Sequence, residues 1–294
     1  MALRIDSDKV SFTADALGTH IRFIAEDRMV GKCIKDVLRG ELSLSSKIIK
    51  KAKYGGVMIN GTPITMRATV RAGDEITVTL QNEESENISP IEHPLRIVYE
   101  DAHILIVDKP ENMPVHPARG NHLTTLANAV MHYFGEMAVF RSVNRLDRDT
   151  SGLVIIAKNQ YVAGLLSDEM KRGGFEKYYT AILASTPKER CGLVDAPIAR
   201  MCEEDILRVV REDGKRALTE YEVDEVYEDG RCRVSIRLHT GRTHQIRVHM
   251  AHIGAPLYAD FLYGKEVEGE CYSLRAHRIV FTHPITGERM DIRA

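Results

Sequence analysis

The chain has 294 residues, of which 44% are hydrophobic and 28% are charged, and its formal net charge at pH 7 is −2. This length and composition are typical of a globular protein with one large and one small domain. Because the net charge is close to zero, overall charge cannot bind the chain to a nucleic acid. A nucleic-acid partner would have to be bound by local basic patches. Five scattered cysteines without a CxxC pair indicate neither a disulfide framework nor a cysteine zinc site.

The first basic patch lies between residues 28 and 53, where eight lysines and arginines face two acidic residues, a local charge of +6. Apolar spacing in this patch predicts a helix that stops at Gly40 and a second helix capped by Ser45 or Ser46. Turns at Asn60-Gly61 and Gly73-Asp74 then predict a small sheet of hairpins.

Two short basic helices followed by Val57-x-Ile59-Asn60-Gly61 and Gly73-Asp74-x-Ile76-x-Val78 resemble the S-four-type RNA-binding domain. The alternative is a basic helix pair that only faces solvent. The resemblance implies RNA contacts by six cations of the patch: Lys32, Lys35, Arg39, Lys47, Lys50 and Lys51. A polar, acidic stretch over residues 81–90 reads as a linker, so we predict an N-terminal domain over residues 1–88 and a second domain over residues 89–294.

The second domain mixes strands and helices without a strict βαβ rhythm. The pattern predicts strands near residues 97–99, 104–107, 153–157 and 177–183, a hairpin over residues 217–238, and helices over residues 126–134 and 159–172. Frequent hairpins favour an α+β fold with a mixed, largely antiparallel sheet and flanking helices.

A charge cluster at residues 144–150 directly precedes the apolar run 153–157, which reads as a buried strand. A carboxylate at the end of a core strand can be held rigidly. We therefore select Asp147, beside the apolar Leu146, as the candidate functional carboxylate and interpret Asp149 as part of the turn.

The second basic segment runs from residue 231 to residue 253 and contains no acidic residue. Alternation within it predicts a strand with arginines on one face, and Thr243 is positioned to cap a following helix. Arg247 on that helix could keep Asp147 ionised. In the alternative reading, Asp147 only caps its turn and Arg247 is a surface charge. The four histidines of the segment lack a nearby carboxylate, so no metal site is predicted.

Several enzyme classes lack their motifs here: there is no Walker loop, GxGxxG, HExxH or GxSxG. A single candidate carboxylate argues against an ordinary glycosidase, which needs an acid and a base. A lone Asp suits attack on, or electrostatic support of, a reactive sugar carbon.

Four ordered motifs resemble RluA-type pseudouridine synthases. They are Lys109-Pro110 through Val115-His116-Pro117, Asn144-Arg145-Leu146-Asp147-x-x-Thr150-Ser151-Gly152-Leu153, Lys177-x-Tyr179-x-Ala181, and Thr240-Gly241-Arg242-Thr243-His244-Gln245-Ile246-Arg247. The likeness spans roughly residues 95–290. Asn144 departs from the family, which often has His there, and we expect this to tune the loop without abolishing activity.

The resemblance implies isomerisation of uridine to pseudouridine in structured RNA without a cofactor or metal. Asp147 would be the catalytic carboxylate, and Arg247 would pair with it. Tyr179 would stack on the base and could also help to move the proton on carbon 5 of uracil. A flipped-out uridine is expected, with Arg145 filling its place or gripping a phosphate. The RNA backbone would be followed by Arg233, Arg237 and Arg242.

Two alternatives stay open at this point: a non-catalytic RNA-binding or ribosome-assembly protein, and an RNA N-glycosidase that releases uracil. The expected partner is RNA, with large-subunit ribosomal RNA favoured over transfer RNA. No signal peptide or long apolar run is found, so a cytoplasmic monomer without a membrane partner is expected.

Overall fold

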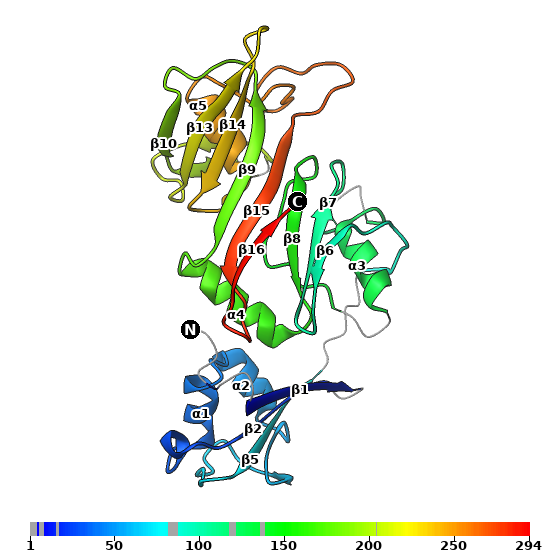
Figure 1. Ribbon diagram of the computed structural model, residues 1–294, viewed down its shortest axis with the longest axis vertical. Helices are drawn as coiled ribbons and strands as arrows, with labels where there is room; N and C mark the ends of the chain where they lie inside the picture. The colour runs from blue at the N-terminus through cyan, green and yellow to red at the C-terminus, as the bar shows by residue number, and fades with distance from the viewer. Residues whose placement is uncertain are drawn as a thin grey trace.

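A computed structural model describes residues 5, 9–15, 18–81, 88–117, 122–135, 139–203 and 205–294. Two sheets organise these residues, a small one near the N-terminus and a long one that carries the rest of the chain (Figure 1). The α+β class, with a mixed and largely antiparallel sheet and few helices, is confirmed.

The small sheet has the strand order β1-β2-β5-β3-β4. Its elements are β1 (Val10–Asp15), β2 (Gly18–Ile24), β3 (Val57–Ile59), β4 (Thr62–Pro63) and β5 (Glu75–Gln81), with the helices α1 (Ile34–Gly40) and α2 (Ser46–Ala52) and a short 3-10 turn, η2 (Asp27–Met29). The predicted helices are confirmed: α1 stops at Gly40, and the Ser45 side chain caps α2 by accepting a hydrogen bond from the Ile48 amide at 3.3 Å. Apolar side chains of both helices are buried with those of the sheet.

The long sheet has the order β10-β13-β14-β9-β15-β8-β7-β6, and β16 pairs with β15. Its strands are β6 (Ile97–Glu100), β7 (Ile104–Lys109), β8 (Ser151–Ala157), β9 (Glu176–Leu183), β10 (Cys191–Asp195), β13 (Leu218–Val226), β14 (Cys232–Leu238), β15 (Leu274–Thr282) and β16 (Arg289–Arg293). Of its pairs, β8 with β15 is parallel and the others are antiparallel. A separate hairpin, β11 (Ile198–Arg200) with β12 (Arg208–Val210), was not predicted from the sequence.

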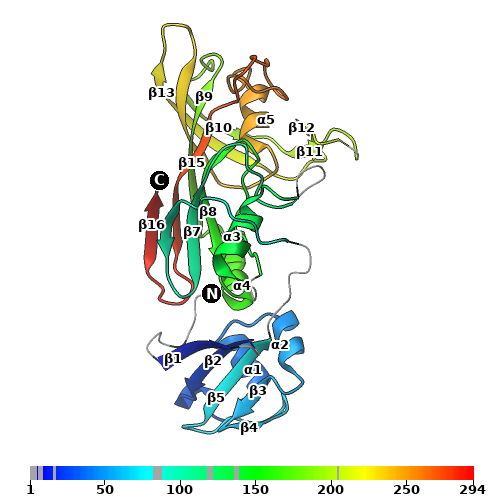
Figure 2. The same ribbon diagram turned by 90° about the vertical axis from the view of Figure 1, so that its right-hand side faces the viewer.

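Three helices pack on this sheet: α3 (Leu126–Phe134), α4 (Gln160–Lys171) and α5 (Gln245–His252). Alternate residues of β7 and β8 belong to two hydrophobic clusters, one shared with α4 and the other with α3 and α5. Both faces of these strands are therefore buried, which explains the uninterrupted apolar run after Gly152. Figure 2 shows α3 and α5 beside the sheet, with α5 near its far end.

Gly152 of β8 lies opposite Ala276 of β15, at a point where only glycine fits. Its φ is +114°, and a Cβ there would lie 2.2 Å from the carbonyl oxygen of Ala276. The glycine of the Thr150-Ser151-Gly152 turn thus lets β8 approach β15 closely, which fixes the start of the strand that follows Asp147.

Strand β1 of the small sheet contacts the loop before β7 and the helix α4. The Phe12 ring packs edge-on against His103 at 4.9 Å and stacks near Tyr161 at 6.1 Å. The predicted linker falls largely on residues 82–87, which lie outside the described residues. Directly after them, the Ser89 carbonyl accepts a hydrogen bond from the Asn128 side chain on α3. The division at residues 88 and 89 stays a prediction. In the described part of the chain, no helix is long and apolar enough to cross a membrane.

Candidate active site

Asp147 lies in a tight loop that leads into β8. The loop closes through a hydrogen bond from the Thr150 amide to the Asp147 carbonyl, at 3.2 Å. Asn144 fixes its other end: the side-chain Nδ2 donates to the Leu153 carbonyl at 3.0 Å, and Oδ1 accepts from the Ile155 amide at 2.9 Å. The buried amide of Asn144 thus bonds to β8 through one donor and one acceptor, and it fixes this end of the loop.

A buried lysine, Lys109, binds the backbone of the same loop. The Lys109 side chain is 1% exposed, and its ammonium donates to the carbonyls of Pro110 at 2.7 Å, Met113 at 2.8 Å and Arg148 at 2.9 Å. Burial lowers the pKa of Lys109 to about 8, although the charge of Asp149 and then that of Asp147 oppose the shift. The Lys109-Pro110 motif therefore ties two loops together beneath the candidate carboxylate.

The two aspartates of the loop differ in their surroundings. Asp149 is buried and accepts two hydrogen bonds from the Arg148 side chain, at 2.8 and 3.1 Å. Asp147 is half-exposed and lines a pocket of about 380 Å³. The structure thus separates a carboxylate that is used internally from one that is free to meet a ligand.

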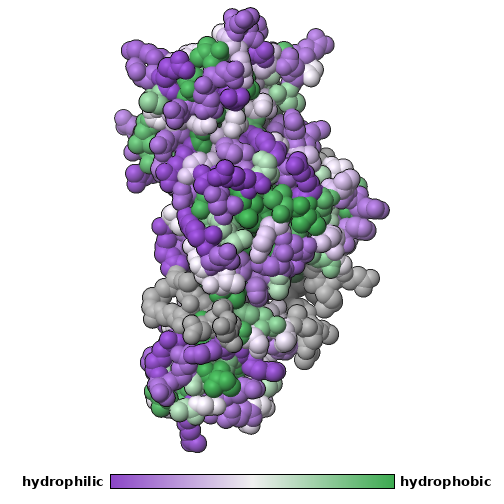
Figure 3. Space-filling model, in the orientation of Figure 1, coloured by the Kyte–Doolittle hydropathy of each residue, from purple (hydrophilic) through white to green (hydrophobic). Residues whose placement is uncertain are grey.

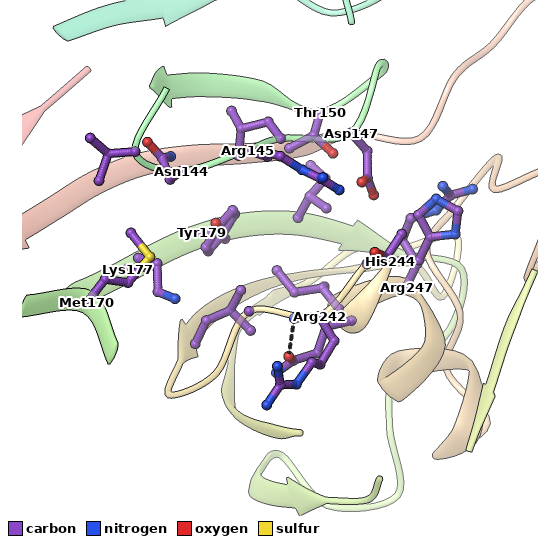
Figure 4. Close-up of a pocket in the computed structure, with 18 residues that line it drawn as sticks. Asn144, Arg145, Asp147, Thr150, Met170, Lys177, Tyr179, Arg242, His244 and Arg247 are labelled. Atoms are coloured by element: carbon purple, nitrogen blue, oxygen red, sulfur yellow. Dashed lines mark hydrogen bonds between the residues drawn. The ribbon is translucent and has the colours of Figure 1, made fainter. Parts of the chain in front are cut away.

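The pocket brings together most of the residues that the sequence placed at the site. Asp147 and Arg145 come from the loop before β8, and Tyr179 comes from β9 (Figure 4). Arg242 lies in the turn before α5, and Arg247 lies on α5 itself. Side chains separated by a hundred residues thus face one cavity, whose volume suits a small ligand group.

Arg247 is not paired directly with Asp147, and this sequence-based expectation is corrected. Its guanidinium forms a bidentate ion pair with Asp260, with Nε–Oδ2 at 2.7 Å and Nη2–Oδ1 at 2.6 Å, and both side chains are almost fully buried. The rings of Tyr272 and Tyr263 flank the guanidinium at 4.3 and 5.0 Å. Burial acts to lower the pKa of Arg247, but the hydrogen bonds to Asp260 and the charges of Tyr272, Asp260 and Asp147 together outweigh it, so that the pKa is raised.

The entry into α5 also differs from the expectation. The N-cap is His244, in the left-handed conformation at φ 57°, and Thr243 does not cap the helix. The Gln245 side chain satisfies the turn instead, because its Oε1 accepts from the Arg242 amide at 2.9 Å. A polar residue inside the first turn can stabilise it from a position that capping rules do not anticipate.

His244 is a pocket residue that the sequence reading left without a role. Its Nδ1 lies 2.7 Å from the Tyr263 hydroxyl, whose oxygen also accepts a hydrogen bond from the Arg208 amide at 2.9 Å. Burial lowers the pKa of His244, and the charge of Asp147 acts against this shift. The ring is thus attached to β12 and lies within the electrostatic reach of the candidate carboxylate. His249 is instead a buried packing residue, bonded to Thr219 and Ala196.

Tyr179 is buried on the face of β9 that looks into the pocket. In register it lies opposite Ile236 of β14 and Ala276 of β15. Burial raises its pKa above the usual value for tyrosine, and the charge of Asp147 raises it further. The side chain is therefore a neutral phenol at physiological pH.

Two of the predicted RNA-binding arginines lie away from the pocket. Arg233 and Arg237 alternate along β14 with core residues, so they project from the opposite face of the sheet. Arg237 is paired with Glu176 at 3.2 Å, and Arg233 with Glu225 at 3.3 Å. In Figure 3 hydrophilic residues cover most of the upper part of the molecule, and a hydrophobic patch lies below it. The structure does not bring these two arginines together with Asp147, and their contact with RNA stays a prediction without structural support.

The cations of the N-terminal patch are exposed on and around α1 and α2. Lys32 lies 3.7 Å from Glu41, and the Arg39 guanidinium donates to the Ser46 hydroxyl at 3.3 Å. Across the described ranges, no group of three or more His, Cys, Asp or Glu side chains is arranged to hold a metal ion.

The buried pair predicts a large effect for the replacement Asp260→Asn. This change leaves Arg247 charged and buried without its partner, so the free energy of unfolding should fall by about 3–5 kcal/mol. Asp291→Asn is the matched control, because Asp291 pairs with Arg278 on the exposed surface, and its replacement should change the free energy of unfolding much less. Urea denaturation of both variants measures the difference, and equal losses would contradict the proposed importance of the buried pair.

Comparison with known proteins agrees with the motifs and the pocket. Residues 103–252 match the model of the RNA pseudouridylate synthase family. The chain is 36% identical to the uncharacterized RNA pseudouridine synthase YjbO of Bacillus subtilis, over 87% of this chain and 92% of that protein. It is also 36% identical to ribosomal large subunit pseudouridine synthase D of Vibrio parahaemolyticus, over 82% of this chain and 79% of that protein.

A solved structure shows the same relationship in three dimensions. Human RNA pseudouridylate synthase domain containing 1 superposes with a TM-score of 0.59 at 27% identity, covering 68% of this chain and 83% of that one. The chain belongs to the RNA pseudouridylate synthase family and is an RNA pseudouridine synthase, an isomerase that acts on RNA.

Proposed function

We propose that this enzyme isomerises uridines of large-subunit ribosomal RNA and that Asp147 is its catalytic carboxylate. The observation that carries the proposal is the shared pocket, where the half-exposed Asp147 meets Tyr179 and the buried Arg247. The names of relatives such as ribosomal large subunit pseudouridine synthase D favour ribosomal RNA over transfer RNA.

In the proposed reaction, the bond between C1′ of the ribose and N1 of uracil breaks, with the Asp147 carboxylate attacking the sugar or stabilising its positive charge. Uracil turns within the pocket, and its C5 forms the new bond to C1′. The proton on C5 leaves and N1 becomes protonated, so that product and substrate are isomers. Free uracil must be retained between the two steps, which requires a pocket closed to water by the bound RNA.

We assign Tyr179 the role of a platform for the uracil ring. Its phenol lies on the pocket face of β9, and its raised pKa disfavours a phenolate that could act as a strong base. Stacking tolerates the rotation of uracil, because an aromatic face interacts with either orientation of the base.

Arg247 is assigned to the electrostatics of the site. The Asp260 carboxylate and two tyrosine rings hold its guanidinium in place, so the positive charge is preorganised near Asp147 without being bonded to it. The carboxylate of Asp147 then stays available for the ribose, which a direct ion pair would partly block.

A uridine inside a helix cannot reach this pocket, so the proposal includes flipping of the base. Arg145, exposed at the pocket rim two residues before Asp147, is placed to fill the gap in the stack or to bind the adjacent phosphate.

Removal of the Arg145 side chain should weaken binding of duplex RNA more than binding of an RNA whose target uridine is already unpaired. Titration of both RNAs measures the two affinities, and equal effects would contradict this role.

The N-terminal unit is proposed to be an S-four-type RNA-binding domain that adds a second contact. Its two helices carry exposed cations, and linkage of two binding surfaces raises the effective affinity for one RNA.

We also expect a cytoplasmic monomer that needs no cofactor. Light scattering of the purified protein would contradict the monomer if it gave twice the chain mass.

The function is tested by mapping pseudouridine in ribosomal and transfer RNA from cells with and without the gene. We expect at least one site in large-subunit ribosomal RNA to disappear with the gene and to return with a wild-type copy. Loss of a transfer-RNA site alone would contradict the assigned substrate. Free uracil released from RNA by the purified protein, without pseudouridine, would instead support the N-glycosidase alternative.

The platform role predicts different effects for Tyr179→Phe and Tyr179→Leu. Phenylalanine keeps the aromatic face, so KM for RNA should stay within about threefold of wild type, whereas leucine should raise it about tenfold. The change of kcat in the Phe variant then measures what the hydroxyl adds to proton transfer. Steady-state kinetics on one RNA provide both constants, and an equal rise of KM in both variants would argue against stacking.

The N-terminal contact predicts a weaker salt dependence for the double variant Lys47→Gln, Lys50→Gln. Each lost phosphate contact should lower the slope of log Kd against log salt concentration by about 0.7–0.9. Arg289→Gln, Arg293→Gln is the matched control, since it removes two charges from β16 that are already paired with Glu176 and Asp291. A slope that is unchanged, or changed equally by the control, would exclude these lysines as RNA contacts.

A further inference from the structure

A lysine in the pocket has no partner that explains its burial. Lys177 lies on β9 two residues before Tyr179, on the same face of the strand, and is 9% exposed. Within the described residues its ammonium donates no hydrogen bond and forms no ion pair, whereas the buried Lys109 ammonium donates to three carbonyls. The stem of Lys177 is buried, whereas its ammonium opens into the pocket, so an external anion can supply the acceptor that the described chain lacks.

A second cation lies beside it. Arg242 lines the same pocket, and its Nε donates to the Arg216 carbonyl at 2.9 Å, which leaves the rest of the guanidinium free of any carboxylate in the described chain. Burial lowers the pKa of Lys177, and the positive charge of Arg242 lowers it further. Two like charges placed close together favour binding of an anion between them.

Lys177 lies against the turn at Gly241. The Lys177 Nζ lies 3.5 Å from the position that a Cβ on Gly241 would occupy, so the lysine packs directly against the turn. Thr243 follows in the same turn and also lines the pocket. An ammonium from β9 and a guanidinium and a hydroxyl from the turn therefore line one pocket, and all three groups can donate to phosphate oxygens.

Other arginines of the same sheet are neutralised by carboxylates. Arg237 pairs with Glu176, Arg278 with Asp291, and Arg275 with Asp108. The lack of such partners at Lys177 and Arg242 is thus a local property, found where the sheet meets the pocket.

The positive surface continues past the turn. A groove of about 510 Å³ shares Gly241, Arg242 and Thr243 with the pocket and is otherwise lined by the β11–β12 hairpin and residues 213–215. Arg200, Arg208 and Lys215 line it, and none of them has an ion pair in the described residues. Its one carboxylate, Asp213, is bound by Arg211, which lowers the pKa of Asp213.

We propose that Lys177 and Arg242 bind the phosphodiester group adjacent to the target uridine and that the groove beyond them carries the next phosphate of the strand. This rests on the proposed function, because it places a uridine in the Asp147 pocket. A phosphodiester has a full negative charge and accepts bidentate bonds from Arg, which suits two cations that line one pocket better than a neutral uracil carbonyl does.

The proposal is tested by binding of the full-length protein to an RNA fragment around the mapped uridine. The fragment is made in three forms, with native linkages or with one neutral methylphosphonate on the 5′ or the 3′ side of that uridine. Lys177→Met keeps the apolar stem and removes the charge. Lys171→Met is the matched control, because Lys171 is an exposed lysine on α4 paired with Asp168.

Lys177→Met should weaken binding of native RNA about tenfold, and the neutral linkage on one side should weaken wild-type binding to a similar degree. When Lys177→Met is tested on the neutral linkage, the affinity should fall less than about twofold below that of either single change. The two changes remove the two partners of one interaction, so their effects should not add. Lys177→Arg should restore most of the affinity, and Lys171→Met should match wild type. Arg242→Gln gives an independent second measurement if Lys177→Met does not fold.

If the loss of affinity from Lys177→Met and the loss from the neutral linkage multiply at both the 5′ and the 3′ position, the variant and the linkage act independently. The same result for Arg242→Gln would then overturn the proposal and would favour a uracil contact for Lys177. Binding is measured without turnover, so this result is independent of whether Asp147 is catalytic. Pseudouridine formation by the wild-type protein on the same native RNA separates a failure of the proposed function from a failure of the phosphate site.

Discussion

The structure of the site depends on how a half-exposed carboxylate is held at the end of a fully buried strand. The Lys109 ammonium, itself buried, fastens the loop of Asp147 to the preceding loop through three carbonyls. Asn144 fixes the other side of the loop to β8, and Gly152 allows β8 to approach β15. With its backbone bonded on both sides, the loop can present Asp147 in one orientation, and a preorganised charge needs little rearrangement during the reaction.

Around this loop, charges are separated into internal pairs and free groups. Asp149 and Asp260 form ion pairs with arginines, whereas Asp147 faces the pocket. Lys109 is satisfied by carbonyls, whereas Lys177 has no acceptor in the described chain. In each case the residue left free is the one that faces the cavity. An RNA strand that supplies a ribose and phosphates would satisfy both free groups at once, which links catalysis to recognition.

Local patterns were sufficient to predict most elements. The stop of α1 at Gly40, the Ser45 cap of α2, and the strand after Asp147 all follow from neighbouring residues, and the structure confirms them. The motifs also selected Asp147, Tyr179 and Arg247, which do meet in one pocket. Such features depend on the spacing of a few residues, which a sequence displays directly.

Long-range partners could not be predicted in this way. Asp260 binds Arg247 from a loop thirteen residues further along, and the Gln245 side chain replaces the expected Thr243 cap. The face on which Arg233 and Arg237 lie depends on how β14 pairs with β9, because a shift of one residue would exchange the two faces. The sequence showed the charges of these residues but not the register that directs them.

The most direct test of the account compares Asp147→Asn with Asp149→Asn on one RNA substrate. Pseudouridine formed per folded molecule is measured under single-turnover conditions, and the folded fraction is determined by circular dichroism. The account predicts that Asp147→Asn folds normally but forms no detectable pseudouridine, whereas Asp149→Asn loses stability and keeps catalysis. Product formation by Asp147→Asn within about tenfold of wild type would contradict the central claim.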